Sequence, residues 1–164
     1  MMTTRKPKST SRRKSPPMQY CTYMIEVLDR KVRYSFSTNR DRVRTPGPYS
    51  EYAAIEITGK LILPEKHAET IIECIIYGRR DYDEFISKPN DFDKIQSGLV
   101  GMINISKDYS NFYGWVPFST FPMIANMLAT EDIKYLQLTG TPLKYRSANV
   151  VSLGLRKDYD PEEC

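Results

Sequence analysis

Short stretches of alternating apolar and polar residues are the main pattern of this chain. From Cys21 to Leu28, and again from Val32 to Ser37, β-branched and aromatic residues occupy every second position. A period of two is typical of strands that bury one face. The pattern therefore predicts two strands here, joined into a hairpin by a turn at residues 29–31.

Further strands are predicted downstream by the same reasoning. They cover residues 55–58 and 61–63, divided at Gly59, followed by 102–105, 133–139 and 147–155. Residues 64–77 allow two interpretations, a helix that begins at Pro64 or a strand over residues 70–77. Two Ile-Ile pairs within six residues favour the strand, because β-branched side chains suit a pleated sheet better than a helix.

One helix is predicted, over residues 119–129. Phe121, Ile124 and Leu128 follow helical spacing, and Ser119 is a suitable N-cap with Pro122 in the first turn. Many short strands and a single short helix indicate a mainly β fold, an antiparallel sandwich or a partly open barrel.

The domain organisation follows from where the apolar residues stop. Residues 1–17 are rich in Lys, Arg, Ser, Thr and Pro, so we expect a disordered basic tail. Residues 18–157 form a single β-rich domain in this interpretation, and residues 158–164 form a frayed acidic C-terminus. No apolar stretch approaches the length of a membrane span, and no secretory signal is recognisable.

Positive charge is concentrated at the start of the chain. Twelve of the 24 basic residues and three of the 20 acidic residues lie within the first 44, which leaves that stretch at +9 and the remaining 120 residues at −5. Such a block should attract polyanions, with an affinity that falls steeply as salt rises. The candidate nucleic-acid-binding residues are Arg5, Lys6, Lys8, Arg12, Arg13, Lys14, Arg40, Arg42 and Arg44.

Aromatic residues flank the arginine-rich segment at 40–44. Tyr34, Phe36 and Tyr49 occur there, and aromatic rings can stack on the bases of nucleic acid. Two plainer interpretations stay open. The tail can be a solubilising segment with no partner, and the arginines can pair with the acidic segment at 81–93.

Signals for catalysis are weak in this sequence. His67 is the only histidine, and it lies in a charged turn without a recognisable nucleophile motif. The three cysteines, which are far apart, predict no zinc site and no disulfide framework, and are typical of reduced thiols in an intracellular protein. An acidic cluster allows a solvated loop, a calcium site or a pair of hydrolytic carboxylates, and comprises Asp81, Asp83, Glu84, Asp91 and Asp93.

A second aromatic group, Tyr109 to Phe118, has either of two roles. If buried it packs a sheet against the helix, and if exposed it stacks on sugars or bases. Taken together, these features predict a non-enzymatic binding module in the cytoplasm, without catalytic residues, metal or cofactor, whose basic tail attracts nucleic acid or another acidic partner. The alternative is a ligand-binding or hydrolytic β-barrel for a sugar, nucleotide or calcium ion. Homo-oligomers are compatible with either.

Overall fold

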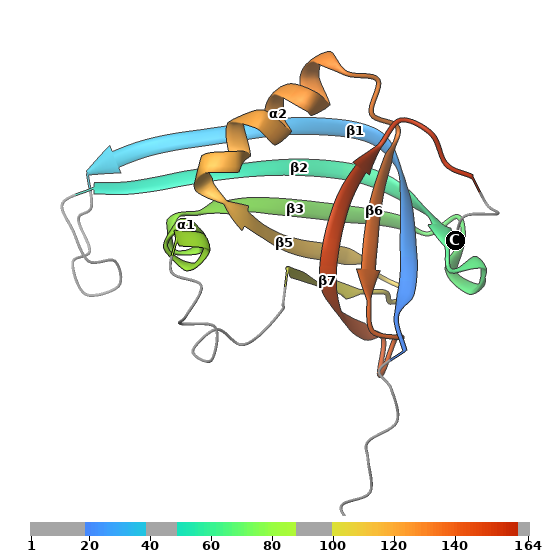
Figure 1. The fold of residues 1–164 in the computed structure, drawn as a ribbon. Helices are drawn as coiled ribbons and strands as arrows, with labels where there is room; N and C mark the ends of the chain where they lie inside the picture. The colour runs from blue at the N-terminus through green and yellow to red at the C-terminus, as the bar shows by residue number, and fades with distance from the viewer. Residues whose placement is uncertain (1–18, 39–48, 88–99, 161–164) are drawn as a thin grey trace, which may run out of the picture.

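Seven strands dominate the computed structural model, which describes residues 19–38, 49–87 and 100–160 (Figure 1). The strands are β1 (Cys21–Thr38), β2 (Tyr49–Leu63), β3 (Ile71–Arg79), β4 (Gly101–Asn104), β5 (Asn111–Pro117), β6 (Tyr135–Gly140) and β7 (Ser147–Arg156). The helical segments are α1 (Arg80–Ser87), α2 (Phe121–Thr130) and two 3₁₀ turns, η1 (Glu65–His67) and η3 (Phe118–Thr120).

The strands form a closed barrel in the order β1-β2-β3-β5-β4-β7-β6, and β6 pairs back onto β1. The mainly β fold that the sequence predicts is confirmed, with the sheet fully closed. Six of the seven neighbouring pairs described are antiparallel, whereas β3 and β5 run parallel. Parallel neighbours need a long crossover, and the chain between β3 and β5 includes α1 and β4.

The interior of the barrel is apolar, as the alternating pattern requires. Ile55 and Ile57 on β2 are buried beside Ile76 on β3, because every second side chain of a strand points to the same face. The predicted helix is confirmed as α2, which packs Phe121, Ile124 and Leu128 onto this core. The strand interpretation of residues 70–77 is also confirmed, as β3.

Several predicted boundaries are wrong. No turn interrupts β1 at residues 29–31, because those residues continue the strand and pair with residues 56–58 of β2. β2 likewise runs through Gly59, where an added Cβ would collide with backbone and side-chain atoms of β1. Two elements were not predicted from the sequence, namely β5 in the aromatic segment and α1 in the charged connection after β3.

Phe112 lies at the centre of the contact between β4 and β5. Its ring is fully buried and packs across Gly101 and Gly114, which are paired with each other in neighbouring strands. A Cβ added at Gly101 would lie 2.5 Å from the Phe112 ring and 2.5 Å from the carbonyl oxygen of Tyr113. The two glycines therefore make room for this ring.

We expect Gly101→Ala to lower the free energy of unfolding by about 1–3 kcal/mol, because the added methyl group overpacks a rigid site. Gly154→Ala is the matched control, since nothing lies within 4 Å of a Cβ added there. Its effect should stay within about 0.5 kcal/mol. Urea unfolding followed by circular dichroism measures both, and equal effects of the two variants would contradict the packing argument.

Candidate functional site

β1 extends far beyond the strand that closes the barrel against it. β6 pairs only with Cys21–Glu26, and one further hydrogen bond joins the Val27 amide to the Lys134 carbonyl at 2.7 Å. From Leu28 to Thr38, β2 is the only neighbouring strand within the described part of the chain. All eleven of these residues are exposed. We call Leu28–Thr38 of β1 together with Tyr49–Ala53 of β2 the arm (Figure 1).

One face of the arm, which we call its inner face, is continuous with the apolar face that lines the barrel interior. On the arm this face is exposed to solvent. Val32 pairs with the buried Ile55 and Tyr34 with the buried Ala53, so their side chains share that face. Phe36 follows two residues later, and Tyr49 joins the face from β2. The exposed fractions are 52% for Val32, 61% for Tyr34, 60% for Phe36 and 56% for Tyr49. Three exposed rings thus lie on one side of one sheet.

Two of these rings already stack on each other. The centroids of Phe36 and Tyr49 are 5.2 Å apart, and their planes differ by 24°. Offset stacking of this kind is a favourable arrangement of aromatic side chains. The pair presents a preformed, flat apolar surface near the end of the arm.

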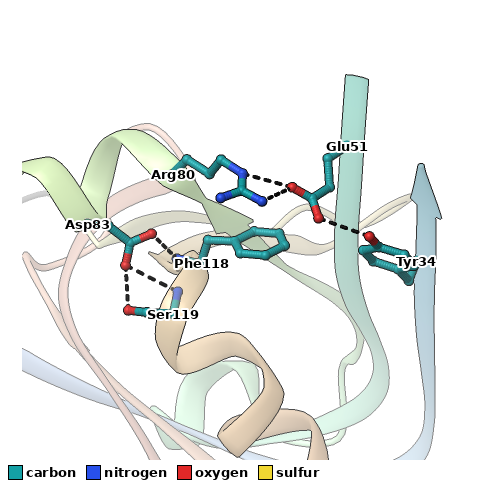
Figure 2. Close-up of polar contacts among 6 residues, drawn as sticks. All are labelled: Tyr34, Glu51, Arg80, Asp83, Phe118 and Ser119. Atoms are coloured by element: carbon teal, nitrogen blue, oxygen red, sulfur yellow. Dashed lines mark hydrogen bonds and ion pairs between the residues drawn. The ribbon is translucent and has the colours of Figure 1, made fainter. Parts of the chain in front are cut away.

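A polar cluster ties the arm to α1 (Figure 2). The Tyr34 hydroxyl donates to one carboxylate oxygen of Glu51 at 2.9 Å, and Arg80 Nε donates to the other at 2.8 Å. The Arg80 guanidinium also lies over the Phe118 ring, 4.5 Å from its centroid. The hydrogen bond from Arg80 is the main reason that the pKa of Glu51 is lowered, and the bond from Tyr34 acts in the same direction.

Asp83 holds α1 against η3, the turn that leads into α2. Its carboxylate accepts the backbone amides of Phe118 and Ser119, both at 3.1 Å, and also the Ser119 hydroxyl (Figure 2). These bonds, chiefly the one from the hydroxyl, lower the pKa of Asp83. Together with Arg80, Asp83 positions η3, the turn that leads into α2, beside the arm.

Basic residues also occur on β1 within the arm. Arg33 forms an ion pair with Glu56 at 2.9 Å, yet its side chain remains 63% exposed. Arg30 donates to the Ile133 carbonyl oxygen at 3.3 Å, and Lys31 is exposed between them. Arg30 pairs with Ile57 and so shares the face of the aromatic row, whereas Lys31 and Arg33 lie on the opposite face of the same strand.

The predicted basic residues lie outside the described part of the chain, namely Arg5, Lys6, Lys8, Arg12, Arg13, Lys14, Arg40, Arg42 and Arg44. Their role stays a prediction. Thr38 and Tyr49 are paired, however, so the segment that carries Arg40, Arg42 and Arg44 starts and finishes at the end of the arm. The aromatic residues that the sequence placed beside this segment are indeed exposed on the arm.

The acidic segment has structural roles where it is described. Asp81 accepts two hydrogen bonds from Arg79, and Asp83 holds η3 as described above. The side chains of Glu84, Asp91 and Asp93 lie outside the described residues. Within the described ranges no group of three or more His, Cys, Asp or Glu side chains is arranged to hold a metal ion. His67 belongs to η1 and is partly buried.

The aromatic segment at 109–118 divides between the two predicted roles. Phe112 is buried in the core, whereas Tyr109 is half exposed and donates a hydrogen bond to Glu73 at 2.9 Å. Tyr109 lines a hollow of about 550 Å³ with Thr70, Glu73 and Lys107. Trp115 does not line this hollow.

The polar cluster on the arm was not predicted from the sequence. Glu51 and Arg80 are 29 residues apart, and no local spacing connects them. The only hint of this contact in the sequence is that Arg80 comes directly after β3, the strand that pairs with β2.

No helix in the described ranges is long and apolar enough to cross a bilayer. No protein-family model matches this chain, and neither does any curated protein or solved structure.

We expect Asp83→Asn to lower Tm by a few degrees at pH 7, because an amide cannot accept all three hydrogen bonds. The folded-state pKa of Asp83 is lowered, so its contribution is present above the unfolded value of about 4 and is lost as pH falls through the folded value. The difference in Tm between variant and native protein should therefore shrink below about pH 4.

Asp81→Asn is the matched control in the same helix. It removes an exposed ion pair with Arg79 without touching η3, so Tm should change little. Differential scanning calorimetry across pH measures both variants. A Tm difference for Asp83→Asn that persists unchanged in acid would exclude the carboxylate as its source.

Proposed function

We propose that this protein is a binding module for single-stranded nucleic acid, and that the bases stack on the inner face of the arm. The observation that carries the proposal is the row formed by Tyr34, Phe36 and Tyr49, each more than half exposed on one face of a sheet. Large apolar groups that stay exposed in a row are typical of interaction surfaces. Arg30, which lies on the same face of β1, adds positive charge that suits an anionic partner.

Single strands fit this surface better than duplexes. Stacking requires unpaired bases whose faces are accessible, and each base–aromatic contact is worth about 1–3 kcal/mol regardless of sequence. Adjacent rings on one sheet face match the way several nucleic-acid-binding sheets receive successive bases. The proposal is therefore a module with little sequence preference.

The basic segments supply the second part of the proposal, an attraction that acts before stacking. Arg40, Arg42 and Arg44 belong to the part of the sequence between the two strands of the arm, and in this proposal they attract the phosphates of a strand whose bases stack there. The six cations of residues 1–17 add further positive charge in this proposal. Contacts of this kind to phosphates carry no sequence information but raise the rate and strength of association.

We expect Phe36→Ala to weaken binding of a labelled single-stranded oligonucleotide about tenfold, because one stacking contact is lost. Fluorescence anisotropy measures this for RNA and DNA strands and for a duplex of the same length, which should bind more weakly. Tyr34→Phe keeps the ring but removes the hydrogen bond to Glu51, so it should retain most of the affinity.

Tyr145→Asn provides a matched control for the loss of an aromatic ring. Tyr145 is 92% exposed between Lys144 and Arg146, but it lies on the turn between β6 and β7. Its backbone has a φ of 52°, which asparagine tolerates well. Binding should be unchanged in this variant. If Phe36→Ala bound as tightly as the native chain, the arm would not be the interface.

We expect the tail to set the salt dependence of binding. A chain that begins at Met18 lacks six cations, and each phosphate contact contributes about −0.7 to the slope of log affinity against log salt for single strands. Its slope should therefore be shallower by up to about 4. Titrations at several salt concentrations test this, and identical slopes would assign the tail no role in binding.

A further inference from the structure

The arm has a second feature that base stacking does not use, which is an open backbone edge. An edge strand exposes unpaired N–H and C=O groups that can pair with another strand, and proteins usually keep such edges short or interrupt them. Here eleven consecutive residues, Leu28–Thr38, have no strand on their outer side among the described residues, and they include no proline. Four of them are large apolar residues that are more than half exposed: Leu28, Val32, Tyr34 and Phe36.

The pairing at the start of β1 shows which backbone N–H and C=O groups point to the open edge. Val27 points its side chain toward the core and its amide toward β6, where it bonds to Lys134. In a strand, residues that share a face also direct their N–H and C=O groups to the same side. The register shifts between Val27 and Asp29, so beyond this bulge the inward-facing residues are even-numbered. Val32, Tyr34 and Phe36 therefore direct their backbone groups to the open edge.

We propose that this edge pairs antiparallel with the same edge of a second copy of the chain, related by a two-fold axis at Tyr34. Each even-numbered residue then meets an even-numbered residue, as the hydrogen-bonding pattern requires. Tyr34 lies opposite Tyr34 of the second copy, and Val32 lies opposite its Phe36. The apolar row of one copy thus continues into that of the other, which is the self-complementarity that a two-fold interface needs.

Charge selects this register over its neighbours. With the axis at Tyr34, Arg33 lies opposite Ser35 of the second copy and Lys31 lies opposite its Ser37, so no like charges face each other. With the axis at Arg33, the two Arg33 side chains would be direct neighbours, which is destabilising. With the axis at Ser35, the paired stretch would be shorter, because the strand ends at Thr38. The Tyr34 register gives the longest pairing without charge repulsion.

This pairing is independent of the proposed nucleic-acid binding, although it would join two aromatic faces into one continuous sheet. It is therefore tested with the full chain in the absence of nucleic acid. Sedimentation velocity over a wide range of protein concentrations should show a monomer and a dimer in equilibrium. Binding of oligonucleotides by a purely monomeric chain would leave the proposed function intact and overturn this inference alone.

Val32→Pro is the decisive variant, because it removes an amide that faces the open edge and not one that bonds to β2. Each dimer loses this bond twice, so the dimer dissociation constant should rise about a hundredfold or more. Val32→Thr is the matched control, since it keeps the amide and the β-branched shape, and it should still dimerise. Far-ultraviolet circular dichroism checks that both variants retain the barrel.

Hydrogen exchange gives a second measurement that needs no variant. Peptides covering residues 28–38 should exchange more slowly as the concentration of the native chain rises, while β3 should be unaffected. Three outcomes would overturn the inference: a chain that stays monomeric, a Val32→Pro variant that dimerises like Val32→Thr, or protection of the edge that does not depend on concentration. Protection that does not depend on concentration would mean that another part of the same chain covers the edge. A monomeric chain that binds extended peptides would mean that the edge pairs with a different protein.

Discussion

Barrel closure depends on six residue pairs between β1 and β6, from Cys21 with Gly140 to Glu26 with Tyr135. β1 contains 18 residues and β6 only six, so closure uses a third of the longer strand. The bulge after Val27 marks the point where β1 leaves β6, and it also reverses which residues face inward. Both surfaces of functional interest, the aromatic face and the backbone edge, follow from this mismatch in length.

An exposed arm needs support from the rest of the fold, and the polar cluster around Glu51 provides it. Tyr34 and Arg80 both donate to Glu51, so one carboxylate joins β1, β2 and α1. Arg80 extends this connection to Phe118. The arm is therefore held at its inner face by charge-assisted hydrogen bonds, while the rings beyond them remain exposed to solvent.

The sequence predicted the class of fold well because alternation is a local signal. Strand β7 and helix α2 follow from periodicity alone, whereas β3 also needed the β-branched content of its two Ile-Ile pairs. The errors arose where tertiary contacts override local preference. Asp29, Arg30 and Lys31 resemble a turn, yet β2 continues them as a strand, and Gly59 resembles a break but allows close contact with β1. Of the candidate site, the aromatic residues were predicted, whereas the Glu51–Arg80 pair was not, because it depends on the neighbouring positions of β2 and β3.

The pairing of β1 with β6 also has a consequence for how the chain is made. Tyr23 donates to the Thr141 carbonyl at 2.7 Å across 118 positions of sequence. During synthesis, the meander of β1, β2 and β3 leaves the ribosome long before β6 exists. During this interval β1 can pair with β2 but not with β6. Contacts between residues so far apart in the sequence slow folding. Until β6 has been synthesised, the edge of β1 that later closes the barrel has no neighbouring strand to pair with.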